Sequence, residues 1–98
     1  MSDKYREKLF RAFLSLKTED EIRNFLMDLC TPGELDAYVE RLEIAHILNA
    51  PNPPSYRDIA QQVGASTTTV TRVAKFLKNQ PYQGYRMVFD RMELDKQK

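Results

Sequence analysis

The sequence is poor in residues on which several classes of protein depend. Its single cysteine, Cys30, has no partner for a disulfide within the chain, which agrees with a reducing compartment. With three glycines it has no glycine-rich phosphate-binding loop. Uncharged apolar runs are only a few residues long, so we expect no membrane span, and the first ten residues lack the apolar core of a signal peptide. These absences predict a cytoplasmic protein. A length of 98 residues predicts a single domain.

Hydrophobic residues recur at the spacing of helices. Strict alternation of apolar and polar residues occurs nowhere over a useful length, which predicts an all-α fold. N-cap residues mark where helices begin, and the proline-rich residues 49–54 separate the third helix from the fourth. We expect six helices, at 5–14, from Thr18 to Leu29, at 32–48, after Ser55, after Ser66 and around 85–92.

The net charge of +1 conceals blocks of opposite sign. Residues 1–17 have a net charge of +3, residues 18–54 of −6 and residues 55–86 of +4, while the last twelve residues are neutral. A basic segment on a short domain favours a polyanionic partner, although uneven charge is also common on surfaces that only meet water.

Residues 55–78 have the spacing of a helix-turn-helix. Ile59 and Val63 lie one turn apart and are expected to face inward. Gly64 suits a left-handed turn, because glycine has no Cβ. Ser66 can cap the second helix, whose buried stripe is expected to contain Val70, Val73, Ala74 and Leu77.

The side of this second helix opposite the buried stripe has a composition that suits nucleic acid. It contains no carboxylate, and hydroxyl, lysine and arginine side chains donate hydrogen bonds to phosphate. Arginine also binds guanine bidentately in the major groove. The pattern predicts binding to double-stranded DNA; the alternative is a small helical hairpin whose polar face only meets water. The residues of this side are Thr68, Thr71, Arg72, Lys75 and Asn79.

Two stretches of the chain share their residues with a known family. They are Thr31-Pro32-Gly33-Glu34 with Arg41, and Arg57 with Gly64-Ala65 and Thr69-Val70-Thr71-Arg72. In these two stretches the chain resembles the Trp repressor family. Within that family it is most similar to the small regulators grouped as YerC/YecD. The resemblance implies a six-helix fold whose dimerisation helices, within 5–48 and 82–94, intertwine with those of a second subunit. Such a homodimer would place its two recognition helices in successive major grooves, about 34 Å apart.

The same resemblance implies a set of DNA contacts. The basic side chains Arg57, Lys75 and Lys78 are expected to bind phosphate, and the threonines at 67–69 to contact base edges. The whole set is Tyr56, Arg57, Ser66, Thr67, Thr68, Thr69, Thr71, Arg72, Lys75 and Lys78.

An effector pocket is implied as well. In the tryptophan repressor the amino acid binds between two arginines, which match Arg41 and Arg72, and Thr31 matches a further pocket residue. Here Val73 stands in place of a glycine and Phe76 in place of a serine, so a phenyl ring could occupy the space of the indole. We therefore expect no tryptophan cofactor, and whether another small anion binds the two arginines stays open. Arg41 could instead pair with a carboxylate of its own helix.

No group in the sequence has the pattern of a catalytic or metal site. His46 lies among apolar residues, where a partly buried structural imidazole is expected, and Cys30 is expected to be a small buried side chain. We therefore expect no enzyme activity and no metal. The predicted function is a dimeric, sequence-specific transcriptional repressor. The alternative is a helical protein-interaction module on a helix-turn-helix scaffold, whose acidic block of residues 18–54 meets a basic partner.

Overall fold

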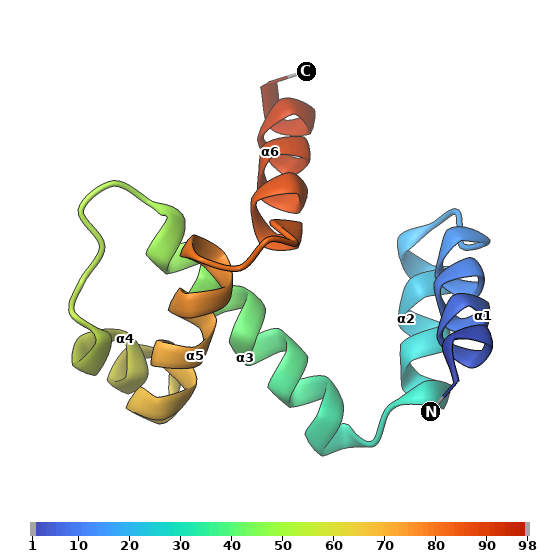
Figure 1. Ribbon diagram of the computed structural model, residues 1–98, viewed down its shortest axis with the longest axis horizontal. Coiled ribbons are helices and arrows are strands. Elements are labelled where there is room, and N and C mark those ends of the chain that lie inside the picture. Colours follow the sequence, from blue (N-terminus) through green and yellow to red (C-terminus); the bar gives the residue numbers. More distant parts are fainter. Residues whose placement is uncertain (1, 98) are drawn as a thin grey trace. The chain divides into compact units, whose positions relative to one another are not determined.

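The computed structural model describes residues 2–97, with side chains through residue 93. No strand occurs in this range, which confirms the prediction of an all-α fold. The six helices are α1 (Asp3–Leu14), α2 (Glu19–Leu29), α3 (Pro32–Asn49), α4 (Tyr56–Val63), α5 (Thr67–Lys78) and α6 (Gly84–Gln97) (Figure 1). The chain forms two compact units, Met1–Leu35 and Asp36–Lys98.

N-cap hydrogen bonds fix where four of the helices begin. The hydroxyls that accept a bond from the backbone N–H three residues later, at 3.1 to 3.2 Å, belong to Thr18, Thr31, Ser55 and Ser66. The Glu34 carboxylate accepts the Thr31 N–H in return at 2.8 Å, which completes a capping box. At Thr18 the return bond is shifted by one residue, because Glu21 Oε1 accepts the Lys17 N–H at 2.8 Å.

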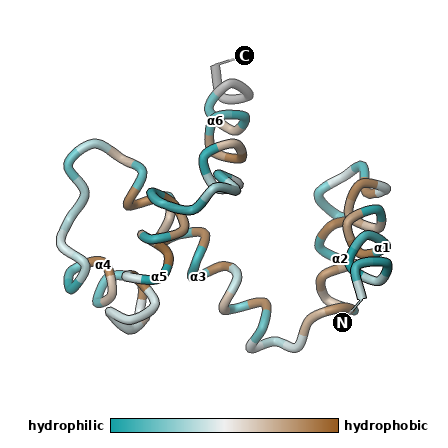
Figure 2. Tube along the Cα trace, viewed as in Figure 1, coloured by the Kyte–Doolittle hydropathy of each residue, from teal (hydrophilic) through white to brown (hydrophobic). Residues whose placement is uncertain are grey.

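The first unit has little interior of its own. α1 and α2 lie side by side (Figure 1), and Phe13 meets Phe25 edge to face with ring centroids 5.3 Å apart. Neither helix contains a buried residue. Tyr5, Phe10 and Leu14 are 65%, 60% and 83% exposed, and Figure 2 shows hydrophobic stretches along both helices. Exposed apolar surface of this extent is typical of a contact site.

The hydrophobic core lies in the second unit. The stripe expected on α5 is buried as predicted. On α3, in contrast, burial begins only at Ile44, and Val39 is 62% exposed. The core residues are Ile44, Ala45 and Leu48 of α3, Ile59 and Ala60 of α4, Val70, Val73, Ala74 and Leu77 of α5, and Phe89 of α6. These residues hold α4 and α5 against the C-terminal half of α3.

A tight turn at Gly64 joins α4 to α5. Gly64 adopts a φ of +83°, and its N–H and that of Ala65 both donate to the Ala60 carbonyl at 2.9 Å. This left-handed conformation is the one predicted for Gly64 from the sequence, because residues with a Cβ adopt it at a cost. The two helices and their short turn have the arrangement of a helix-turn-helix.

The start of α6 is tied to the end of α5. Arg86 Nε donates to the Leu77 carbonyl at 3.1 Å, which satisfies one of the carbonyls that a helix leaves free at its C-terminus. Tyr85, the residue before Arg86, stacks on the buried Phe89 one turn further along α6, with ring centroids 6.3 Å apart. These contacts fix the first turns of α6 beside α5.

Candidate nucleic-acid interface

One side of α5 presents polar side chains to solvent. All members of this side are exposed, and α5 contains no Asp or Glu. Because Lys, Arg and hydroxyl side chains donate hydrogen bonds and no carboxylate repels phosphate, the surface suits a polyanion. Its members, which we call the basic face, are Thr67, Thr68, Thr71, Arg72, Lys75 and Lys78.

The hydroxyls at the start of α5 differ in how far they are already used within the protein. Thr69 is half-buried, and its hydroxyl lies 3.0 Å from Ser66 Oγ, which also accepts the Thr69 N–H. Thr71 Oγ1 donates to the Thr67 carbonyl at 2.9 Å. The hydroxyls of Thr67 and Thr68 have no hydrogen-bond partner among the described residues. These two threonines therefore keep their full hydrogen-bonding capacity for a ligand.

Arg72 bends toward its own helix. Its Cζ lies 4.5 Å from the centroid of the Phe76 ring, one helical turn further along α5. Phe76 is half-buried whereas Arg72 remains exposed. A cation–π contact of this kind orients the guanidinium without using its N–H donors, so they stay available to an anion.

The start of α4 and the end of α5 come together at the same surface. Lys78 Nζ lies 6.0 Å from the centroid of the Tyr56 ring, and Tyr56 is 38% exposed. The neighbouring Arg57 is exposed as well. The start of α4 thus adds the Tyr56 ring and the exposed Arg57 beside the Lys78 end of the basic face.

Four of the five residues expected around an effector line one cavity of about 550 Å³. They are Arg41, Arg72, Val73 and Phe76. The fifth, Thr31, belongs to the first unit, where it caps α3. The cavity therefore has two guanidinium groups and the Phe76 ring in its wall.

Three further residues line this cavity that the sequence did not predict, namely Tyr38, Leu42 and Tyr85. Tyr38 precedes Arg41 by three residues on one helix, a spacing that could have indicated the contact, and the Arg41 Cζ lies 5.3 Å from the centroid of its ring. Tyr85 belongs to α6, and nothing local in the sequence connects it to α3. The ion pair considered for Arg41, with Glu40 or Asp36, does not form among the described residues.

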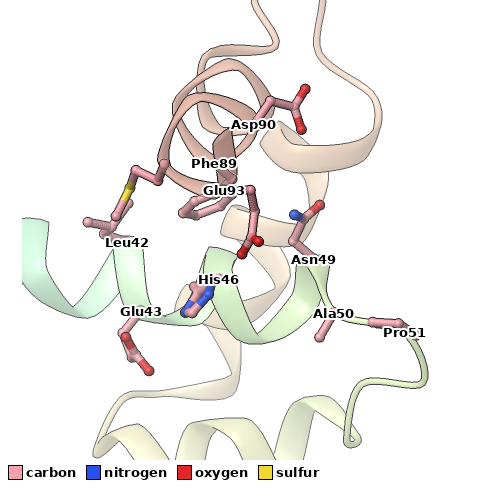
Figure 3. A pocket seen from close by; sticks show the side chains of 10 residues that line it. Leu42, Glu43, His46, Asn49, Ala50, Pro51, Phe89, Asp90 and Glu93 are labelled. Atoms are coloured by element: carbon pink, nitrogen blue, oxygen red, sulfur yellow. The ribbon is translucent and has the colours of Figure 1, made fainter. Parts of the chain in front are cut away.

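His46 is exposed, so the expectation of a partly buried imidazole is wrong. The neighbouring Ala45 faces the core, and successive residues of a helix point in different directions, so His46 is turned outward. Its ring packs against Phe89 with centroids 5.5 Å apart. Figure 3 shows this pair in a second cavity, of about 390 Å³, between α3 and α6, with Glu43 and Glu93 also at its wall.

Other chemistry is sparse in the part of the chain that the structure describes. Cys30, expected to be buried, is half-buried. Between residues 2 and 97 no group of three or more His, Cys, Asp or Glu side chains is arranged to hold a metal ion. Nor does any helix there combine the length and hydrophobicity needed to cross a membrane.

Known proteins resemble this chain in both sequence and structure. The family model described as Trp repressor protein matches residues 4–93. YerC of Bacillus subtilis strain 168, itself uncharacterized, is 39% identical over 87 residues, which cover 89% of this chain and 81% of YerC. The crystal structure of a TrpR-like protein from Eubacterium eligens matches with a TM-score of 0.84 and 39% identity, over 94% of this chain and 92% of that one. A candidate Trp repressor from Staphylococcus aureus matches with a TM-score of 0.83 and 34% identity, over 94% and 89% of the two chains.

Proposed function

This chain belongs to the Trp repressor family and has its all-α fold, and on that basis we propose that it is a sequence-specific DNA-binding regulator that represses transcription. The family is one of regulators rather than enzymes. The observation that supports DNA binding most directly is the basic face, because every member is exposed and α5 contains no carboxylate. An arrangement of this kind lets a helix approach phosphates without repulsion.

Each part of the interface has a distinct role in the proposed complex. Arg57, Lys75 and Lys78 bind phosphates and set the register of the protein on the duplex. Thr67 and Thr68 contact base edges, because their hydroxyls are not used within the protein. The Ser66–Thr69 hydroxyl pair instead stabilises the first turn of α5.

The proposed regulator acts as a homodimer. The exposed apolar side chains of α1 and α2 give a second copy a surface to cover, and two-fold symmetry duplicates the basic face. Two copies of α5 then meet half-sites one helical turn of DNA apart, about 34 Å.

The salt dependence of DNA affinity tests this proposal. Fragments that the protein selects from genomic DNA would be labelled, and their Kd measured by fluorescence anisotropy at two salt concentrations. A protein that contacts several phosphates loses affinity steeply as salt rises, and Lys75→Ala should reduce the slope by about 1. Lys17→Ala, which removes an exposed charge far along the chain from α5, is the matched control and should leave the slope unchanged. Little binding even at low salt would contradict DNA binding and favour the protein-interaction module.

Tryptophan is not required in this proposal. The Phe76 ring stands in the wall of the cavity that contains Arg41 and Arg72, and the Arg72 guanidinium lies over that ring. The ring and the guanidinium already contact each other, so an indole would have to displace one of them. Calorimetric titration with L-tryptophan should give no binding, and DNA affinity should be equal with and without the amino acid; a micromolar Kd would contradict this.

A further inference from the structure

An acidic groove lies between α3 and α4. It has a volume of about 460 Å³ and is lined by Asp36, Val39, Glu40, Glu43, Ile47, Gln62 and Val63. Its α3 residues recur at helical spacing, so they share one side of that helix. The lining contains no Lys or Arg, and its three carboxylates pair with no cation among the described residues. With Val39 62% exposed between them, the groove suits a partner that is both basic and apolar.

α1 has a surface of this kind. Lys4, Lys8 and Arg11 are spaced by four and three residues, so they lie along one edge of the helix. Tyr5, three residues before Lys8, lies beside that edge and is 65% exposed. Lys4 and Lys8 form no ion pair within the described residues, and Arg11 approaches Glu7 only to 3.9 Å. The basic edge of α1, defined by these three cations, is therefore available to carboxylates.

We propose that the basic edge of α1 docks in the acidic groove of a second copy of this chain. The inference rests on the homodimer of the proposed function. It identifies a charged contact between the two copies of this dimer. Three cations meet three carboxylates, and the Tyr5 ring covers the exposed Val39. Two-fold symmetry makes the contact twice in each dimer, so its modest individual ion pairs act together. DNA cannot bind in the acidic groove, because the carboxylates of the groove repel phosphate.

Charge reversal on either side tests the contact. The first variant is Lys4→Glu with Lys8→Glu, and the second is Asp36→Lys with Glu43→Lys, all four at exposed positions. In each variant alone like charges face each other in both contacts, and the dimer Kd measured by sedimentation should rise at least about tenfold at low salt. Asp58→Lys reverses the charge of an exposed residue outside both the groove and the expected dimerisation helices, and should leave the Kd unchanged.

Mixing the two variants distinguishes a contact between copies from one within a chain. In a mixed dimer, reversed α1 meets reversed groove and native α1 meets native groove, so both contacts are attractive again. Equal amounts of the two variants should therefore form dimers with nearly the native Kd, although neither does so alone. If the mixture stays monomeric while one chain with all four substitutions dimerises, α1 occupies the groove of its own chain and the proposal is wrong.

The remaining outcomes separate this inference from the function on which it rests. A native protein that sediments as a monomer contradicts the proposed homodimer. A native dimer whose Kd is unaffected by the reversals overturns the docking of α1 alone, and leaves the DNA-binding proposal intact. Should the variants lose helicity by circular dichroism, the salt dependence of the native dimer decides: its Kd should rise with salt, and a salt-independent Kd overturns the docking.

Discussion

At the scale of single residues, the five side chains from Thr67 to Thr71 illustrate what local sequence can and cannot predict. Four of them are threonines, and all four were expected to contact DNA, those at 67–69 at base edges. The structure separates them, because Thr69 shares a hydrogen bond with Ser66 and Thr71 donates to a backbone carbonyl. The distinction depends on which hydroxyls turn toward an acceptor in the first turns of α5, and residue type alone does not determine this.

Replacement of Arg72 by alanine is expected to weaken operator binding more than it weakens the fold. The side chain is exposed and its guanidinium donors are free, so DNA affinity should fall by about 1–3 kcal/mol. Loss of the contact with Phe76 should cost the free energy of unfolding only about 0.5–1 kcal/mol. Anisotropy and thermal melting measure the two quantities. Arg23→Ala, which removes an exposed arginine of α2, is the control that should leave DNA affinity unchanged; a Tm loss without an affinity loss for Arg72→Ala would make Arg72 structural.

Replacement of Gly64 is expected to strain the turn between α4 and α5. A Cβ at this position would meet nothing within 4 Å, so the cost arises from the backbone φ of +83° alone. For alanine we expect about 1–2 kcal/mol of lost stability, and more for the β-branched valine. Gly33→Ala is the matched control, because that glycine has equal space but lies in the first turn of α3 without a positive φ. Equal melting temperatures for the Gly64 and Gly33 variants would contradict the strained turn.

At the scale of helices, starts were easier to predict than buried faces. Caps depend on residues three apart, so Thr18 and Thr31 indicated the starts of α2 and α3 correctly. Apolar residues recur at helical spacing along α3, yet Ala45 and Leu48 are buried whereas Tyr38 and Val39 are exposed. An apolar stripe predicts that a side will be covered, but it does not say by which element or by which copy.

The capping box of α3 should make stability depend on pH. The Thr31 backbone N–H, and to a smaller degree the Thr31 side chain, hold the pKa of Glu34 below its ordinary value of 4.5. A lowered pKa in the folded state means that the stabilisation is fully present above pH 4.5 and is lost as the pH falls through the folded pKa. Melting temperatures measured across this range should therefore differ between the native protein and Glu34→Gln, with the difference shrinking on acidification. Parallel pH profiles for the two proteins would contradict this role, and Asp28→Asn, outside any cap, serves as the control.

At the scale of the whole molecule, the two units differ in how completely their apolar faces are covered. The second has a core to which four helices contribute, whereas α1 and α2 have no buried residue. The all-α class and the helix-turn-helix were predictable because each depends on patterns within one segment. His46 and Tyr85 were not, because their surroundings are contributed by helices far apart in the sequence.

The unequal covering leads to a prediction for the assembled protein. If a second copy covers the apolar faces of α1 and α2, unfolding releases two chains, and the melting temperature must depend on protein concentration. A hundredfold rise in concentration adds about 2.7 kcal/mol to the free energy of unfolding of the dimer, which should raise the Tm by several degrees. The Tm can be measured by circular dichroism at 222 nm. Shortening the path length of the cell as the concentration rises keeps the absorbance constant, so the melting curves can be compared directly. Helicity of α1 and α2 should disappear together with that of the core, because the same association stabilises both units. A Tm that is identical at every concentration would instead mean that the single chain covers its own apolar surface, and the homodimer would have to be abandoned.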